Sequence, residues 1–264
     1  MPSDAAGAAL PLIEPAWPGG PPPGVAAAMS TRHGGVSVAP WESLNLGVAV
    51  GDDPAAVAIN RGRFARVLGA RPVWLRQVHG TRVLRLDAGT PEHPSEPADA
   101  AWTTERGIAC TVQVADCLPV LLATGDGRAV AAVHAGWRGL AGGVLEATVA
   151  ALHEGAGVEP AELRAWLGPC IGPSAFEVGA DVLAGFGRAQ LAADQPAFRW
   201  APRADGSARW RADLPQLARE RLAALGVAAV AVHGGCTVAG ASGFFSFRRD
   251  GVTGRMAAAV WRRA

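Results

Sequence analysis

The sequence predicts a single α/β domain in which helices cover a mixed β-sheet. Short apolar runs typical of strands alternate with segments whose apolar residues recur at helical spacing, and this alternation is typical of the class. Two of the apolar runs, 118–124 and 129–133, are joined by Gly125-Asp126-Gly127-Arg128. Gly and Asp tolerate the positive φ angles of a tight turn, so the two runs are expected to form a hairpin.

The other elements are predicted from helix caps and from apolar spacing. Asp53 can cap a helix over 53–68, and Pro54 suits its first position. A helix is also expected over 138–154, although the pair Gly142-Gly143 weakens it by about 1 kcal/mol per Gly. Further helices are expected at 180–186 and 213–225. Strands are expected at 25–31, 73–78, 81–86, 108–114, 163–167 and 227–232, and those at 108–114 and 227–232 are expected to be buried. The chain is expected to close with a hairpin at 244–248 and 253–261.

The domain organisation follows from length and composition. A chain of 264 residues, half of them hydrophobic, can bury the core of one large domain. Residues 1–24 are rich in proline and carry no basic residue, so they lack the charged start of a signal peptide. We expect residues 1–24 to be a disordered tail and residues 25–264 to form one catalytic domain.

The charge balance limits the partners. The 24 basic residues, all of them Arg, face 23 acidic ones, which leaves no global field to attract nucleic acid or an anionic membrane. No run approaches 18 apolar residues, so no membrane span is expected. The four cysteines show no C-x-x-C spacing, which favours thiols or metal ligands in a cytoplasmic protein. We therefore expect no nucleic acid and no membrane as partners; the sequence specifies no oligomeric state.

One pair of residues points to chemistry. Folding the predicted hairpin about its turn places Cys117 opposite Gly136 and His134 opposite Pro119. The thiol and the imidazole then lie on diagonal cross-strand neighbours, whose backbones are roughly 7–8 Å apart. A thiolate and an imidazole at this range can share one metal ion.

A third ligand can come from the end of the strand at 73–78. His79 follows that strand and precedes a glycine, where side chains can converge on a pocket; the alternative is a hydrogen-bonded structural histidine. Two histidines and one cysteine leave the fourth position of a zinc ion open, as in catalytic zinc sites. Asp116 could orient one imidazole or, alternatively, cap a turn.

Several further residues have two readings each. Arg138, at the start of the helix after His134, could hold an anion together with the neighbouring amides, or could belong to a packed corner. Arg248 could point to a substrate anion or form a solvated ion pair. His233 and Cys236 could bind a second metal, but no third ligand lies nearby in the sequence. The remaining cysteines are Cys110, which is expected to pack as a small hydrophobe, and Cys170, whose role stays open.

Seven motifs together resemble a known family. They are TRHGGVS at 31–37, SLNLG at 43–47, QVHG at 77–80, ADCLP at 115–119, HAGWRG at 134–139, LGP at 167–169 and FSFRRD at 245–250. The string closely resembles the family variously named multicopper polyphenol oxidoreductase (laccase-like), zinc-containing purine nucleoside phosphorylase, and peptidoglycan editing factor. The resemblance extends from about residue 25 to residue 263.

The resemblance implies an α/β/α fold and a zinc ion held by the residues matching His79, Cys117 and His134. It also implies phosphorolysis of adenosine, inosine and 5′-methylthioadenosine, with deamination of adenosine. Other members are described as cytosolic editors that remove wrongly incorporated serine from peptidoglycan precursors. One departure is Cys170, which stands where alanine is more usual and adds a thiol near the site.

We therefore predict a zinc-dependent purine nucleoside phosphorylase with adenosine deaminase side activity. Asp116 is expected among the catalytic residues, beside the three metal ligands. Asn45, Gln77, Arg138 and Arg248 are expected to bind substrate. The alternatives are an editing amidase that uses the same zinc and a non-enzymatic protein whose structural zinc is closed by Cys170 or Cys236.

A true laccase is disfavoured. A four-copper oxidase needs roughly ten imidazole ligands arranged in His-x-His pairs. This chain has six histidines and no His-x-His sequence. A single Cu²⁺ in the same two-histidine, one-cysteine site, with weak oxidase activity, is the copper alternative.

Overall fold

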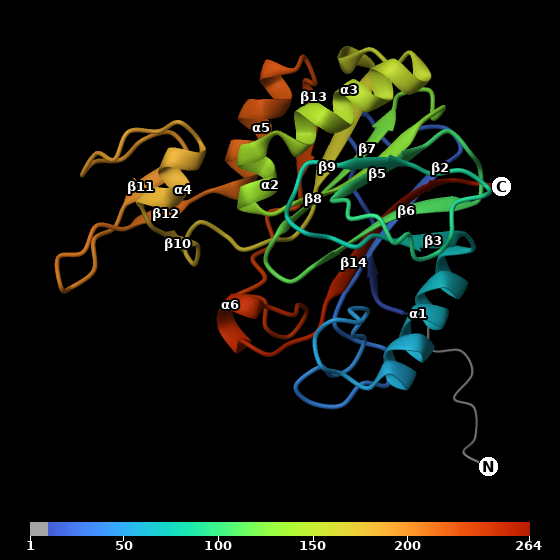
Figure 1. The fold of residues 1–264 in the computed structure, drawn as a ribbon, viewed down its shortest axis with the longest axis horizontal. Coiled ribbons are helices and arrows are strands. Elements are labelled where there is room, and N and C mark those ends of the chain that lie inside the picture. The colour runs from blue at the N-terminus through green and yellow to red at the C-terminus, as the bar shows by residue number, and fades with distance from the viewer. Residues whose placement is uncertain (1–9) are drawn as a thin grey trace.

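The computed structural model describes residues 10–264. Two mixed β-sheets pack face to face, and helices cover their outer faces (Figure 1). The five-stranded sheet runs in the order β1 (Leu12–Ile13), β2 (Val25–Ser30), β14 (Met256–Arg262), β6 (Ile108–Val114) and β3 (Arg71–Trp74). The six-stranded sheet runs in the order β13 (Ala229–Val232), β9 (Leu163–Leu167), β7 (Leu118–Thr124), β8 (Val130–Ala135), β5 (Ala100–Thr103) and β4 (Val83–Arg85).

The helices lie on opposite sides of this pair of sheets. On the five-stranded sheet lies α1 (Pro54–Leu68), and on the six-stranded sheet lie α2 (Trp137–Gly142), α3 (Val144–Ala156) and α5 (Leu214–Ala224). An arm projects from the body (Figure 1); it contains β10 (Glu177–Val178), α4 (Ala180–Gly185), β11 (Phe198–Trp200) and β12 (Trp210–Ala212). Two short turns of helix complete the list, the 3-10 helix η1 (Pro160–Glu162) and α6 (Phe247–Asp250).

Strand alternation explains how the two sheets share one core. Successive side chains of a strand point to opposite faces. Leu121 and Ala123 of β7 therefore meet Val112 and Val114 of β6 between the sheets, and all four are buried. The residues between them, such as Leu122, face the helices instead. The predicted α/β class with a mixed sheet and flanking helices is confirmed, with two packed sheets in place of one.

Elements that were predicted from short stretches of sequence are confirmed. The hairpin of β7 and β8 forms, with Pro119 paired to His134 as predicted. Asp53 caps α1 by accepting a hydrogen bond from the backbone N–H of Ala55, and the helix ends at Leu68. The predicted strands at 108–114 and 163–167 match β6 and β9 residue for residue.

Three predictions of elements are wrong. The helix predicted over 138–154 is divided into α2 and α3 at Gly143, whose φ of +99° is left-handed. The predicted closing hairpin does not form: residues 247–250 are the short helix α6, capped by Ser246, and β14 pairs with β2 and β6. The strand predicted as buried at 227–232 is the edge strand β13, only partly buried, because β9 is its one neighbour in the described sheet.

The predicted disordered tail is wrong over residues 10–24. Leu12 and Ile13 pair with β2, and Trp17 packs in the core between the sheets with 8% of its surface exposed. Burial of this large apolar side chain gives the segment a place on the sheet despite its prolines. Residues 1–9 of the predicted tail lie outside the described residues.

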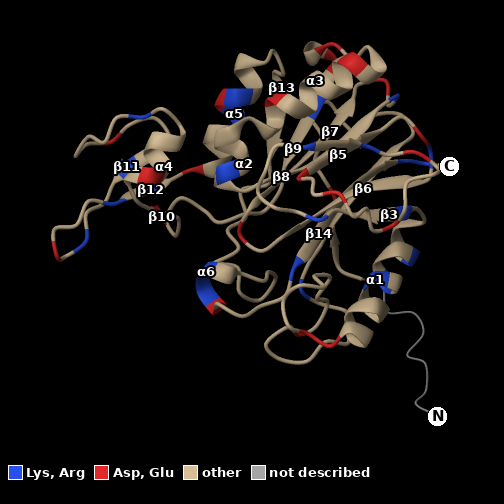
Figure 2. Cartoon of the chain, viewed as in Figure 1, with Lys and Arg blue, Asp and Glu red and all other residues tan. Residues whose placement is uncertain are grey.

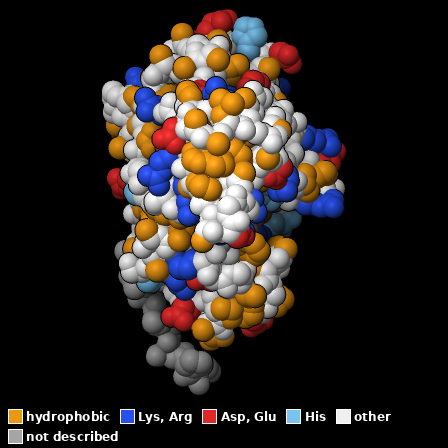
Figure 3. Space-filling model, turned by 90° about the vertical axis from the view of Figure 1, so that its left-hand side faces the viewer, with side chains coloured by type: hydrophobic (Ala, Val, Ile, Leu, Met, Phe, Trp, Pro, Cys, Tyr) orange, Lys and Arg blue, Asp and Glu red, His pale blue; other side chains and the backbone are white. Residues whose placement is uncertain are grey.

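The surface carries charges of both signs without a single dominant field. In Figure 2 the positions of Arg and of acidic residues are dispersed over the body and the arm. Figure 3, which looks onto the side from which the arm projects, shows hydrophobic side chains in patches between charged ones. Within the described residues, every helix is too short or too polar to cross a bilayer.

Candidate metal centre

The predicted cysteine and histidine lie where the β7–β8 hairpin opens. Leu118 pairs with Ala135 at the last register position, so Cys117 and Gly136 are the first residues beyond it. His79 arrives from the loop after β3, with a left-handed φ of +60°. The strand predicted at 73–78 ends at Trp74, which frees the following residues to turn toward the hairpin.

The three side chains form one cluster. Ligand atoms of His79, Cys117 and His134 all lie within 4.8 Å of one another. The distance from Cys117 Sγ to His79 Nε2 is 3.6 Å. Zn–S and Zn–N bonds of about 2.3 and 2.0 Å at a tetrahedral angle place sulfur and nitrogen about 3.5 Å apart, close to this distance. The geometry and the thiolate–imidazole donor set therefore fit a zinc ion.

Gly136 gives the cluster its room. A Cβ atom built on this residue would lie 2.7 Å from His79 Cδ2 and 3.0 Å from Cys117 Sγ. Its backbone is extended, with φ of −62°, so the need for glycine here comes from the close approach of the two ligands. The glycine after the histidine is therefore part of the site.

Asp99, which the sequence analysis did not single out, fixes both histidines. Its side chain is fully buried, and Oδ1 lies 2.8 Å from His134 Nδ1. The same carboxylate accepts hydrogen bonds from the backbone N–H groups of Val78, His79 and Gly80, at 3.1, 2.8 and 2.7 Å. A carboxylate on Nδ1 leaves Nε2 of His134 free to bind a metal.

The ionisation of the cluster favours the metal-binding form of Cys117. Burial alone would raise the pKa of the Cys117 thiol, but the charge and hydrogen bond of His134, with those of His79, lower it to about 6. Burial would lower the pKa of His134, but the charge of Cys117 and the bond to Asp99 raise it. Burial also opposes ionisation of Asp99, yet the hydrogen bonds from His134 and Gly80 lower its pKa. The thiolate, which is the metal-binding form of cysteine, is thus stabilised.

The hypothesis that Asp116 orients an imidazole is wrong. Its Oδ1 accepts a hydrogen bond from Thr237 Oγ1 at 2.6 Å, and its Oδ2 accepts one from the backbone N–H of Arg248 at 2.6 Å. Its backbone carbonyl accepts a bond from the N–H of Ile171. Asp116, the residue before Cys117, therefore binds three other chain segments together. This role is closer to the alternative prediction, in which Asp116 caps a turn.

Asn45 and Gln77 also have structural partners. The buried amide of Asn45 donates to Asp52 Oδ2 at 2.8 Å and accepts from the N–H of Arg255 at 2.8 Å. Gln77 exchanges two hydrogen bonds with the backbone of Gln113, at 2.7 and 2.8 Å. These bonds give both side chains a scaffolding role, and their contact with substrate stays a prediction.

The two arginines that were predicted to bind an anion differ in how far their guanidinium groups are already hydrogen-bonded. Arg138 is exposed, its guanidinium carbon lies 4.4 Å from the centre of the Trp137 ring, and no hydrogen bond holds it within residues 10–264. Arg248 donates to the carbonyl oxygens of Ala175 and Glu177 at 3.3 and 3.2 Å. Arg138 is available for an anion, whereas Arg248 joins α6 to the arm.

No other cysteine of the described chain closes the cluster. Cys110 is buried in β6, and burial raises the pKa of its thiol. Cys170 and Cys236 lie on adjacent backbone segments, and neither belongs to the group of ligand atoms. His233 accepts a hydrogen bond from the N–H of Gly235, and the second metal pair proposed for it gains no third ligand. Among the described residues, no fourth His, Cys, Asp or Glu joins the three ligands.

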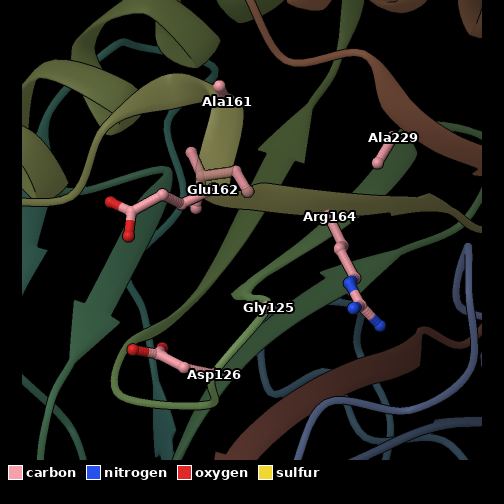
Figure 4. Close-up of a pocket in the computed structure, with 7 residues that line it drawn as sticks. Gly125, Asp126, Ala161, Glu162, Arg164 and Ala229 are labelled. Carbon is pink, nitrogen blue, oxygen red and sulfur yellow. The ribbon is translucent and has the colours of Figure 1, made fainter.

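A depression of about 310 Å³ lies at the other end of the hairpin (Figure 4). Asp126 and Glu162 on its rim are both paired with Arg128, and Arg164 donates to the carbonyl of Gly20 at 2.8 Å. The seven residues of β7 separate it from the cluster by about 20 Å. Its charges are satisfied within the protein, so the cluster is the candidate site.

Comparison with known proteins shows the family of this chain. The family model described as multi-copper polyphenol oxidoreductase laccase matches residues 26–263. A Pseudomonas aeruginosa protein named purine nucleoside phosphorylase PA4543 is 50% identical over 253 residues, covering 94% of this chain and 97% of that protein. Escherichia coli purine nucleoside phosphorylase YfiH is 48% identical over 252 residues, covering 95% and 98%.

Solved structures show the same architecture. Neisseria meningitidis protein NMB0706 superposes with a TM-score of 0.83 at 43% identity, covering 96% of this chain and 99% of that one. YlmD from Geobacillus stearothermophilus superposes with a TM-score of 0.84 at 32% identity, covering 97% and 100%.

The fold and the cluster together define a class of protein. It is an α/β protein in which a His–Cys–His group able to hold a metal ion lies at the open end of a central hairpin. The chain belongs to the multi-copper polyphenol oxidoreductase laccase family, and the resemblance inferred from its motifs is confirmed.

Proposed function

We propose that the protein is a zinc-dependent purine nucleoside phosphorylase of the cytoplasm, acting on adenosine, inosine and 5′-methylthioadenosine, with adenosine deamination as a side activity. The observation that carries the proposal is the compact group of His79, Cys117 and His134 with an open fourth position. Catalytic zinc sites have this arrangement, whereas structural sites are closed by four protein ligands. The names of the close relatives support the same reaction class.

The residues of the chain have separable roles in this proposal. His79, Cys117 and His134 would hold the zinc ion, which would supply Lewis-acid chemistry at this site. Asp99 keeps both imidazoles in place. In phosphorolysis an oxygen of phosphate bonds to the anomeric carbon of the ribose, and the bond to the purine nitrogen breaks with its electron pair. The exposed Arg138 is available to hold the incoming phosphate.

Copper and cell-wall substrates are the alternatives for the same site. Thiolate and imidazole ligands also suit copper. Cu²⁺ would therefore bind to the same three residues and would support weak oxidase activity. His79 is exposed and Cys117 half-buried, and a centre open to solvent also admits a larger substrate such as a peptidoglycan precursor. An amidase reaction on such a precursor is therefore the second candidate function.

The test combines metal analysis with product analysis. The purified protein is assayed for zinc and copper, and adenosine turnover is followed with and without phosphate. About one zinc per chain, with adenine formed only when phosphate is present, is the expected result. Inosine as the sole product would make the enzyme chiefly a deaminase, and zinc without nucleoside turnover would favour the amidase. A His79→Ala variant should lose metal and activity together.

A further inference from the structure

Arg255 lies beside the metal centre. Met256 pairs with Val114 in the register of β14 and β6, so the next position places Arg255 opposite Ala115, two residues before Cys117. Its guanidinium is half-buried and close enough to the cluster to respond to it: burial lowers its pKa, and the charges of Cys117 and Asp116 partly offset that effect. The register of β14 and β6 therefore places this residue near the metal ligands, and no carboxylate within residues 10–264 pairs with it.

The guanidinium of Arg255 is incompletely paired. Its Nη1 donates to the carbonyl oxygens of Thr253 and Gly254, both at 3.0 Å. Within residues 10–264, Nε and Nη2 have no hydrogen-bond partner, no ion pair involves this residue, and neither nitrogen is sealed from solvent. A half-buried guanidinium that has no counter-ion, and whose free edge reaches solvent, is able to bind an anionic ligand.

The surroundings hold this arginine in one place. The backbone N–H of Arg255 donates to Asn45, which Asp52 anchors in turn. The stem of the side chain runs across Gly47, where an added Cβ would lie 2.6 Å from Arg255 Cγ. The guanidinium carbon lies 5.9 Å from the centre of the Phe247 ring, an aromatic side chain that is 58% exposed. The charge is therefore preorganised beside an exposed aromatic surface.

We propose that Arg255 is an anion-binding residue of the metal centre and that its ligand is the phosphate co-substrate. The free Nε–Nη2 edge of the guanidinium can bind two oxygens of a phosphate at once. The phosphate would then lie between Arg255 and the metal ligands, with Phe247 as the wall nearest the nucleoside. The identity of the anion rests on the proposed function, whereas the anion site itself rests on the geometry of Arg255.

The first test measures binding without turnover. Inorganic phosphate is titrated calorimetrically into the zinc-loaded protein, at an ionic strength fixed with chloride, for the wild type, Arg255→Gln and Arg138→Gln. Arg255→Gln should weaken phosphate binding by about tenfold or more, the usual effect of losing a charge-assisted bond, with Arg138→Gln affected less. Unchanged binding by Arg255→Gln, or a larger loss in Arg138→Gln, would overturn the proposal.

A parallel titration with acetate separates the two chemical sources of an anion. Binding of acetate but not phosphate, lost in Arg255→Gln, would indicate a substrate carboxylate and would contradict the assignment to phosphate. Arg255→Lys keeps the positive charge but cannot form a bidentate contact, so it should bind phosphate with intermediate affinity. This variant also keeps the test valid if Arg255→Gln unfolds, which its melting temperature and zinc content report.

Kinetics separate the proposal from the proposed function. In Arg255→Gln the KM for phosphate should rise by about tenfold, while the KM for the nucleoside changes by less than about twofold. A wild type that binds phosphate through Arg255 but turns over no nucleoside would refute the phosphorylase and leave the anion site standing. A wild type that phosphorolyses nucleosides, with an unchanged KM for phosphate in Arg255→Gln, would refute the role of Arg255 alone.

Discussion

Asp99 and His134 are joined by a 2.8 Å contact between Oδ1 and Nδ1, and this buried carboxylate connects the two histidines of the metal centre. The other bonds of the Asp99 carboxylate come from the backbone N–H groups of residues 78–80, which include His79. One side chain therefore sets the orientation of one ligand and the position of another. Such partners commonly contribute about 10–100-fold to metal affinity.

Asp99→Asn should weaken zinc binding by about 10–100-fold, because the amide is a poorer acceptor for His134 and for three backbone N–H groups. Competition with a chelator of known affinity measures the change. Asp126→Asn, on the exposed hairpin turn, is the control and should bind zinc like the wild type. Equal zinc affinity in Asp99→Asn and the control would show that the carboxylate does not support the metal ligands.

Gly136→Ala should lose metal while keeping its backbone conformation. The added methyl group meets His79 and Cys117 at 2.7 and 3.0 Å, although φ of −62° is acceptable for alanine. Zinc content and melting temperature report the two effects separately. Gly62→Ala is the matched control: nothing lies within 4 Å of its new methyl group in α1, and it should stabilise the fold by about 0.5–1 kcal/mol. Full zinc occupancy in Gly136→Ala would contradict the crowded geometry.

Metal removal should expose one thiol. Cys110 and Cys170 are buried, with 0% and 2% of their surfaces exposed, whereas Cys117 and Cys236 are half-buried. A thiol reagent should label two cysteines rapidly in the metal-free protein and one in the zinc-loaded protein. Mass spectrometry of the labelled peptides identifies them, and Cys117→Ser should remove the difference. Rapid labelling of Cys117 with zinc bound would mean that this residue is not a ligand.

Asp116→Ala should destabilise the fold more than it affects metal binding. It leaves the N–H of Arg248 and the hydroxyl of Thr237 without their acceptor, at a cost of about 1–3 kcal/mol in the free energy of unfolding. Asp116→Asn keeps one acceptor oxygen and should cost less. Urea unfolding measures both variants, and zinc analysis shows whether the cluster survives. A stable Asp116→Ala protein that has lost its zinc would reverse the role assigned to this residue.

The sequence could predict the metal ligands because the decisive geometry is local. Seven residues of β7, a four-residue turn and the start of β8 fix which residues oppose each other, so Cys117 and His134 had to meet. The cap of α1 and the strands at 108–114 and 163–167 are likewise local. The position of Asp99 directly before the apolar run at 100–102 was a sequence signal that its carboxylate is buried. A buried carboxylate needs hydrogen-bond partners, so this signal pointed to a role in the site.

The wrong predictions share a different cause. The segment at 256–262 is apolar on both faces, and only the pairing with β2 and β6, strands remote in sequence, shows that it lies inside a sheet and not in a terminal hairpin. Gly143 offered a place to break a helix, but the break depends on how α2 and α3 pack. Trp17 is buried because two sheets leave room for it.

The sequence by itself determined the α/β class, the family and the three side chains that can hold a metal ion, because each depends on motifs and on the register of one hairpin. Only the tertiary structure decided what surrounds them. Asp99 supports the histidines, Asn45 positions Arg255, and Asp116 holds a loop, through contacts that span between 7 and 210 positions of the chain. Such contacts form when apolar burial assembles the sheets, and no local pattern specifies them.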